Sequence, residues 1–151
     1  MFLSDWFKKW DEPRSSPVEE YLKILVLCTS LEDRFLLERL GKRHGWDLWF
    51  VESARAGFRL VSENAFDVIL CDRNQPGYPW REVVDRLTTS SPRSCVMLIS
   101  PMKDDYLWGE VILHGGYDVV SRPLREDSLL RVIQAAVRYL APPPTVPSAS
   151  G

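Results

Sequence analysis

Two kinds of hydrophobic pattern alternate along residues 22–140. Short runs at 24–28 and 67–71 are apolar almost throughout, which is typical of strands buried on both faces of a parallel sheet. Between such runs, apolar residues recur three or four positions apart, the spacing of an amphipathic helix. Strand and helix patterns in alternation predict an α/β fold, in which crossover helices connect the strands of a parallel sheet.

The pattern predicts strands at residues 24–28, 46–51, 67–71, 95–100 and 117–121, and helices at 31–44, 53–64, 80–87, 104–116 and 126–140. Gly45 is expected to end the first helix, because glycine readily adopts the conformation that follows helix ends. Asp104 and Asp105 are expected to begin the fourth helix, where carboxylates interact favourably with the helix dipole.

Residues 22–140 are expected to form one domain, since 151 residues are too few for two ordinary domains. Residues 1–21 are interpreted as an amphipathic extension and linker. The apolar face of this extension consists of Phe2, Leu3, Trp6, Phe7 and Trp10. It packs on its own domain or on a second copy, binds a separate partner, or lies at a membrane surface. Residues 141–151 are rich in proline and are expected to be disordered.

Composition argues against several classes of function. The net charge of -2 gives no basic footprint for nucleic acid. Apolar runs are shorter than the ~20 residues that span a bilayer, and no secretory signal is visible, so a cytoplasmic protein is expected. Cys28, Cys71 and Cys95 lie in or beside apolar runs and are expected to be free, buried thiols. The glycines form no nucleotide-binding motif, and no nucleophile, histidine and acid set is legible, so neither an enzyme nor a bound cofactor is predicted.

Polar residues follow or end three of the predicted strands. Asp72 stands in FDVILCDRNQPG, Ser100 ends VMLIS, and Arg122 precedes a proline in YDVVSRP. In this order the motifs resemble those of bacterial response regulator receiver domains, the CheY-like family, over residues 22–140. The resemblance implies a flavodoxin-like (βα)5 three-layer sandwich with strand order 2-1-3-4-5.

The resemblance also implies roles for individual residues. Asp72 occupies the phospho-acceptor position, Ser100 a position that contacts the phosphoryl group, and Arg122 the position of the family's lysine, which makes the same contact. Val119 occupies the switch position, where receivers usually carry Tyr or Phe. The family's partner-binding face lies on the fourth helix, fifth strand and last helix, and its candidate contacts here are Tyr106, Trp108 and Tyr117.

The end of the first strand departs from the family pattern. Receivers carry two acidic residues there that hold Mg²⁺, but the equivalent residues in ILVLCTSLEDR are Cys28 and Thr29. Mg²⁺ prefers oxygen ligands, and a thiol is a poor substitute. With those two carboxylates absent, Asp72 is expected to form a standing, partly buried ion pair with Arg122, and to have Arg122 to itself.

The leading hypothesis is an atypical receiver-like module of a two-component or phosphorelay system. It would bind a protein partner, a histidine kinase or a downstream signalling protein, largely independently of Mg²⁺-dependent phosphorylation. A homodimer is also possible under this hypothesis. One alternative is a phosphorylatable single-domain regulator with Asp72 as acceptor and Mg²⁺ as cofactor. A second is a flavodoxin-fold enzyme or cofactor-binding protein, which would need a phosphate-binding loop after the first strand.

Overall fold

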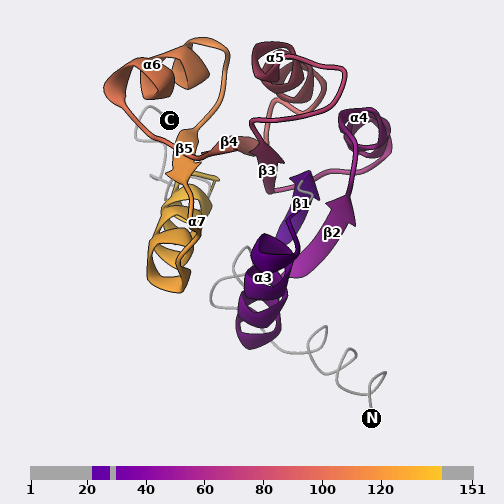
Figure 1. The fold of residues 1–151 in the computed structure, drawn as a ribbon. Helices are drawn as coiled ribbons and strands as arrows, with labels where there is room; N and C mark the ends of the chain where they lie inside the picture. Colours follow the sequence, from indigo (N-terminus) through magenta and orange to yellow (C-terminus); the bar gives the residue numbers. More distant parts are fainter. Residues whose placement is uncertain (1–21, 28–29, 141–151) are drawn as a thin grey trace, which may run out of the picture.

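The computed structural model describes residues 22–27 and 30–140, which form five βα units (Figure 1). In chain order they are β1 (Lys23–Leu27), α3 (Leu31–His44), β2 (Asp47–Val51), α4 (Ala54–Glu63), β3 (Val68–Asp72), α5 (Trp80–Ser90), β4 (Cys95–Ser100), α6 (Asp105–Leu113), β5 (Asp118–Ser121) and α7 (Glu126–Leu140). All strand pairs are parallel, in the order β2-β1-β3-β4-β5. The predicted flavodoxin-like fold is confirmed.

Helices cover both faces of the sheet and make a three-layer sandwich. Figure 1 shows α3 and α7 below the sheet and α4, α5 and α6 above it. Neighbouring residues of each central strand point to opposite faces, so β1 contributes Ile24 and Val26 to one core and Leu25 and Leu27 to the other. This double burial explains why the strands are apolar at nearly every position.

The sequence pattern predicts the boundaries of α3, β4 and α7 correctly, and the other elements differ by one to three residues. Gly45 ends α3 with a φ of 73°, as predicted. The side chain of Asp104 caps α6 by accepting a hydrogen bond from the Leu107 backbone at 2.8 Å. Helix α5 continues three residues beyond its predicted end, through polar residues that carry no hydrophobic signal. Helix α6 ends at Leu113, before Gly115, whose φ is 93°.

Strands β2 and β5 are the two edges of the sheet, and the carboxyl ends of β1, β3 and β4 lie together between them. The loops that follow β3 and β4 therefore begin at one edge of the sheet, beside the end of β1. The loop after β5 joins them and contains a cis peptide bond between Arg122 and Pro123. Across the described ranges, no helix has the length and hydrophobicity that a membrane crossing requires. The amphipathic extension (1–21) and the proline-rich tail (141–151) fall outside these ranges.

Candidate functional site

Asp72 and Arg122 form the predicted ion pair. Asp72 is the last residue of β3 and is only 6% exposed. Nη2 of Arg122 donates a hydrogen bond to Oδ2 of Asp72 at 2.6 Å, and the backbone N–H of Asn74 donates to Oδ1 at 2.8 Å. Each oxygen of the acceptor-position carboxylate therefore already accepts a hydrogen bond from the protein.

The expectation that Asp72 has Arg122 to itself is wrong, because Arg122 also binds Asp33. Nη2 and Nε of Arg122 lie 2.6 and 3.0 Å from Oδ2 of Asp33, a residue in the first turn of α3 that is 5% exposed. The Asp33 backbone donates to the Ser30 side chain, which caps the helix. Because α3 starts so soon after β1, its first turn lies at the carboxyl edge of the sheet. A carboxylate thus enters the site from the helix.

The electrostatic balance of the site depends on Arg122, whose side chain is 23% exposed. Burial lowers the pKa of its guanidinium, but hydrogen bonds to Asp72 and Asp33, together with their negative charges, raise it, and the net pKa is above that of an ordinary arginine. Arg122 therefore remains charged. Its positive charge offsets the repulsion between the Asp33 and Asp72 carboxylates.

Ser100 lies at the same edge, at the end of β4, and is fully buried. Its Oγ accepts hydrogen bonds at 3.3 Å from Nη1 of Arg73 and from the Met102 backbone. The Arg122 backbone N–H donates to the Ser100 carbonyl at 2.9 Å, which holds the loop after β5 against β4. Arg73 is a second cation of the site, and the sequence-based prediction does not include it. Its position directly after Asp72 is the signal that could have identified it.

The loop after β3 is fastened by Gln75, which is buried. Its Nε2 donates to the Asp72 carbonyl at 3.0 Å and to the Leu27 carbonyl, at the end of β1, at 3.3 Å. Gly77, with a φ of 83°, turns the chain two residues later. Gln75 thus links the ends of β1 and β3, a role that its position in a polar loop does not reveal.

The described residues do not fit a bound magnesium ion as they are arranged. The two carboxylates that converge, those of Asp33 and Asp72, are both bonded to the same Nη2 atom at 2.6 Å, so a guanidinium occupies the space between them. Cys28 and Thr29, at the degenerate metal positions, lie outside the described residues. By residue type they offer a thiol and a neutral hydroxyl in place of two carboxylates. Within the described ranges, no group of three or more potential metal ligands from His, Cys, Asp and Glu occurs.

The remaining predicted residues lie apart from this cluster. Val119 is buried in the core between the sheet and helices α4, α5 and α6. On α6, Tyr106 is 71% and Trp108 45% exposed, and a residue that contacts a partner must be exposed. Tyr117 is half-buried, and its ring lies 5.4 Å from that of Tyr139. Whether these side chains contact a partner stays a prediction.

Cys71 and Cys95 are free, buried thiols, as predicted. Burial raises the pKa of Cys71 to about 12, with a further contribution from the charge of Asp72. Cys28 lies outside the described residues.

Comparison with known proteins finds similarities of sequence and of fold. No protein-family model matches the chain. Protein PilH of Pseudomonas aeruginosa is 27% identical over 119 residues, which cover 76% of this chain and 97% of PilH. The chemotaxis response regulator CheY4 of Vibrio cholerae has a similar structure, with a TM-score of 0.70, 19% identity, and coverage of 77% of this chain and 98% of CheY4.

The chain is thus similar in sequence to PilH and shares the fold of the CheY-like receiver domains. Another similar structure is the receiver domain of a sensor histidine kinase from Pseudomonas aeruginosa, which has a magnesium ion coordinated in its active site cleft. Its TM-score is 0.68 at 15% identity, with coverage of 78% of this chain and 98% of that domain. In the present chain, Arg122 joins a helix carboxylate, Asp33, to Asp72 at the carboxyl edge of the sheet.

Proposed function

We propose that this receiver domain is a non-catalytic signalling module that binds its protein partner largely independently of Mg²⁺-dependent phosphorylation. The partner would be a histidine kinase or a downstream protein of a two-component system, encountered in the cytoplasm. Residues 22–140 would carry the function, with an amphipathic extension before them and a disordered tail after them. The observation that carries the proposal is the single Nη2 atom of Arg122, which lies 2.6 Å from both Asp33 and Asp72.

This arrangement opposes both steps that conventional phosphorylation requires. An acceptor carboxylate must present an oxygen to the phosphorus atom, but Oδ1 and Oδ2 of Asp72 are both engaged. Phosphoryl transfer also depends on cations that neutralise the charge of the transferred group, usually metal ions. Here the guanidinium is already committed to two carboxylates, so a phosphoryl group would have to compete with them.

One observation favours the alternative of a phosphorylatable regulator. Arg73 is half-buried and donates to Ser100, the hydroxyl that the family resemblance assigns to phosphoryl contact. A guanidinium at that point could supply positive charge that a metal otherwise provides. The two functions therefore differ in whether Asp72 can be released from Arg122.

Magnesium and beryllofluoride titrations separate the two functions. Backbone amide shifts of Asn74 and Gln75, beside Asp72, report on occupation of the site. We expect no saturable shift at low millimolar Mg²⁺, and none on further addition of beryllofluoride, because Arg122 holds both carboxylates. A matched control is the double variant Cys28→Asp with Thr29→Asp, which restores the acidic pair and should gain Mg²⁺ affinity. A saturating shift in the unaltered protein, with or without beryllofluoride, would establish the phosphorylatable alternative instead.

A further inference from the structure

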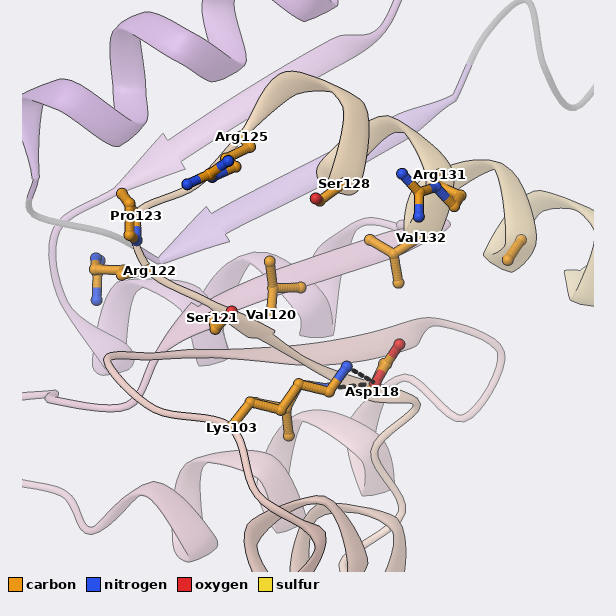
Figure 2. A pocket seen from close by; sticks show the side chains of 12 residues that line it. Lys103, Asp118, Val120, Ser121, Arg122, Pro123, Arg125, Ser128, Arg131 and Val132 are labelled. Atoms are coloured by element: carbon orange, nitrogen blue, oxygen red, sulfur yellow. Dashed lines mark hydrogen bonds and ion pairs between the residues drawn. The ribbon is translucent and has the colours of Figure 1, made fainter.

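A cleft runs along the outer edge of β5, on the opposite side of that strand from β4. Its volume is about 740 Å³. One wall contains Lys103, from the loop after β4, and the other contains Arg125, Ser128 and Arg131, at and after the start of α7. All four residues of β5 line the cleft, and Figure 2 labels Asp118, Val120 and Ser121 of this strand. The cleft is thus bordered along its length by the backbone of an edge strand.

The open edge of β5 offers backbone hydrogen bonds. Among the described strands, β5 pairs only with β4, in parallel register from Asp118 to Ser121. In Figure 1, β5 lies at the end of the sheet between α6 and α7, with no strand beyond it. An edge strand carries N–H and C=O groups that can pair with an added extended segment. Four residues of strand correspond to about 13 Å, enough to pair with a segment of four to six residues.

The charges in the cleft favour a negatively charged occupant. Lys103 lies 3.4 Å from Asp118 and these two charges offset each other, as the dashed lines in Figure 2 show. Arg122 is bonded to the two carboxylates of the site. Arg125 and Arg131 are exposed, and neither has an ion pair with any described residue. Two cations on the α7 side are therefore available for carboxylates of a ligand.

The spacing on α7 suits an extended ligand. Ser128, Arg131, Val132 and Ala135 recur at helical spacing on the face toward the cleft. Three of these side chains are short, so they leave room for a peptide beside β5. Arg125 directly precedes α7, and Arg131 lies in its second turn, about 9 Å further along the helix axis at about 1.5 Å per residue; alternate residues of a strand are about 7 Å apart. Acidic residues at alternate positions could thus reach both arginines.

We propose that a partner protein adds an extended acidic segment to β5 as an extra strand, with carboxylates at alternate positions paired to Arg125 and Arg131. The inference rests on the proposed function and deepens it. The family resemblance implies this general face, and the edge strand and the two arginines supply the mode of binding and the chemistry of the partner segment.

A second copy of the chain is a poorer occupant. Pairing of two β5 edges about a twofold axis would place Arg125 and Arg131 of both copies in one interface, where Asp118, the acidic residue of the cleft, is already paired with Lys103. Nucleic acid is also a poorer occupant, because the whole chain carries a net charge of -2 and would repel a polyanion outside the cleft. A short acidic peptide interacts mainly with the cleft itself.

The test uses a fluorescein-labelled nine-residue peptide in which glutamate alternates with threonine, and the full chain. Fluorescence anisotropy measures affinity, and amide shifts with hydrogen exchange locate the bound peptide. We expect saturable binding, with shifts and slower exchange in Asp118–Ser121. Arg125→Glu with Arg131→Glu should weaken binding at least about tenfold, because it reverses both charges. The matched control is Arg55→Glu with Arg59→Glu, two exposed arginines of α4, which should leave affinity within about twofold.

Two altered peptides separate charge from backbone pairing. Replacing every glutamate by lysine should abolish binding. Methylating alternate backbone nitrogens, which keeps the charge but removes half of the N–H donors, should weaken binding at least about tenfold if those donors face β5. Two peptides, each methylated on one of the two alternate sets of nitrogens, show which set faces β5, because methylation of that set weakens binding. Equal affinity for every methylated peptide, an undiminished affinity in the Arg125 and Arg131 variant, or tighter binding of a nine-nucleotide single strand would overturn the inference.

Two results distinguish this inference from the proposed function. Absence of acidic-peptide binding, or self-association of the chain through β5, would overturn strand addition while the magnesium and beryllofluoride titrations could still support the proposed function. Conversely, a saturating response in those titrations would contradict the proposed function, whereas peptide binding at β5 would still stand as a property of the phosphorylatable alternative. Measuring peptide affinity with and without Mg²⁺ and beryllofluoride completes the comparison, and equal affinities are expected.

Discussion

Arg122→Ala is the substitution that most directly tests the ion-pair cluster. Arg122 binds Asp33 and Asp72, whose side chains are 7% and 8% exposed. Its removal leaves two buried carboxylates near each other without the cation that joins them. Removing one partner from a buried ion pair commonly costs about 3–5 kcal/mol, so we expect the free energy of unfolding to fall by that amount.

The same substitution should cost less when Asp72 has already lost its charge. At an effective dielectric constant of about 20, unit charges about 4 Å apart interact by about 4 kcal/mol. This attraction between Arg122 and Asp72 is missing in Asp72→Asn. We therefore expect Arg122→Ala to be less costly by at least about 1 kcal/mol in the Asp72→Asn protein. Asp72→Asn alone should have a small effect, because it loses a bond to Arg122 but also relieves repulsion from Asp33.

Equilibrium urea denaturation of the unaltered protein, both single variants and the double variant measures this coupling. Tryptophan fluorescence follows the transition, and similar m-values would confirm that the same amount of surface is exposed on unfolding in all four proteins. Arg131→Ala is the control, because Arg131 is exposed and has no ion pair with a described residue. It should change the free energy of unfolding by no more than about 0.5 kcal/mol.

Two results would refute the reasoning. If the effects of Arg122→Ala and Asp72→Asn simply add, the two charges are not coupled in the folded protein. If Arg122→Ala costs no more than Arg131→Ala, the guanidinium does not stabilise buried carboxylates. Either result would mean that Asp72 is held free of Arg122, as the phosphorylatable alternative requires.

Three further predictions concern other regions of the chain. Cys71, whose pKa burial raises to about 12, should react with iodoacetamide at pH 8 at least about 100-fold more slowly in folded than in urea-unfolded protein, as measured by mass spectrometry of its peptide. Hydrogen bonds from Arg39 and Arg43 lower the pKa of Glu126, so the stability that Glu126→Gln removes should be present at pH 7. It should be lost progressively as the pH falls below 4.5 and through the lowered pKa, and a difference that does not change with pH would contradict this. Deleting residues 1–12 should preserve cooperative unfolding but alter self-association or partner binding, as measured by sedimentation, because it removes five large apolar side chains, Phe2, Leu3, Trp6, Phe7 and Trp10. Loss of the transition would make the segment a component of the core.

The sheet was predictable because burial on both faces leaves a simple record in the sequence. Residues 68–71 and 96–99 are apolar without interruption, and both form central strands. The exact ends of helices were harder to predict. Helix α5 continues to Ser90 through Thr88, whose hydroxyl bonds to the Val84 carbonyl, and no hydrophobic periodicity marks that last turn.

The site was only partly predictable, because strand ends are visible in a sequence and contacts between distant elements are not. Asp72, Ser100 and Arg122 each follow or end a predicted strand, so their proximity follows from a parallel sheet. Asp33 reads as an ordinary acidic residue of a first helical turn, a position that the helix dipole alone explains. Its contact with Arg122 joins residues 89 positions apart and depends on how closely α3 follows β1.

The position of Asp33 changes the meaning of the missing acidic pair. With Cys28 and Thr29 at the positions of the acidic pair, Asp72 alone would balance the charge of Arg122 but would give its guanidinium only one carboxylate to bind. Asp33 on α3 supplies a second carboxylate, and Nη2 of Arg122 binds it at the same 2.6 Å as Asp72. A planar guanidinium can donate to two carboxylates through neighbouring N–H groups more readily than a single ammonium. Arginine at position 122 and aspartate at position 33 therefore make sense together, as members of one cluster in which a side-chain cation lies between the acids.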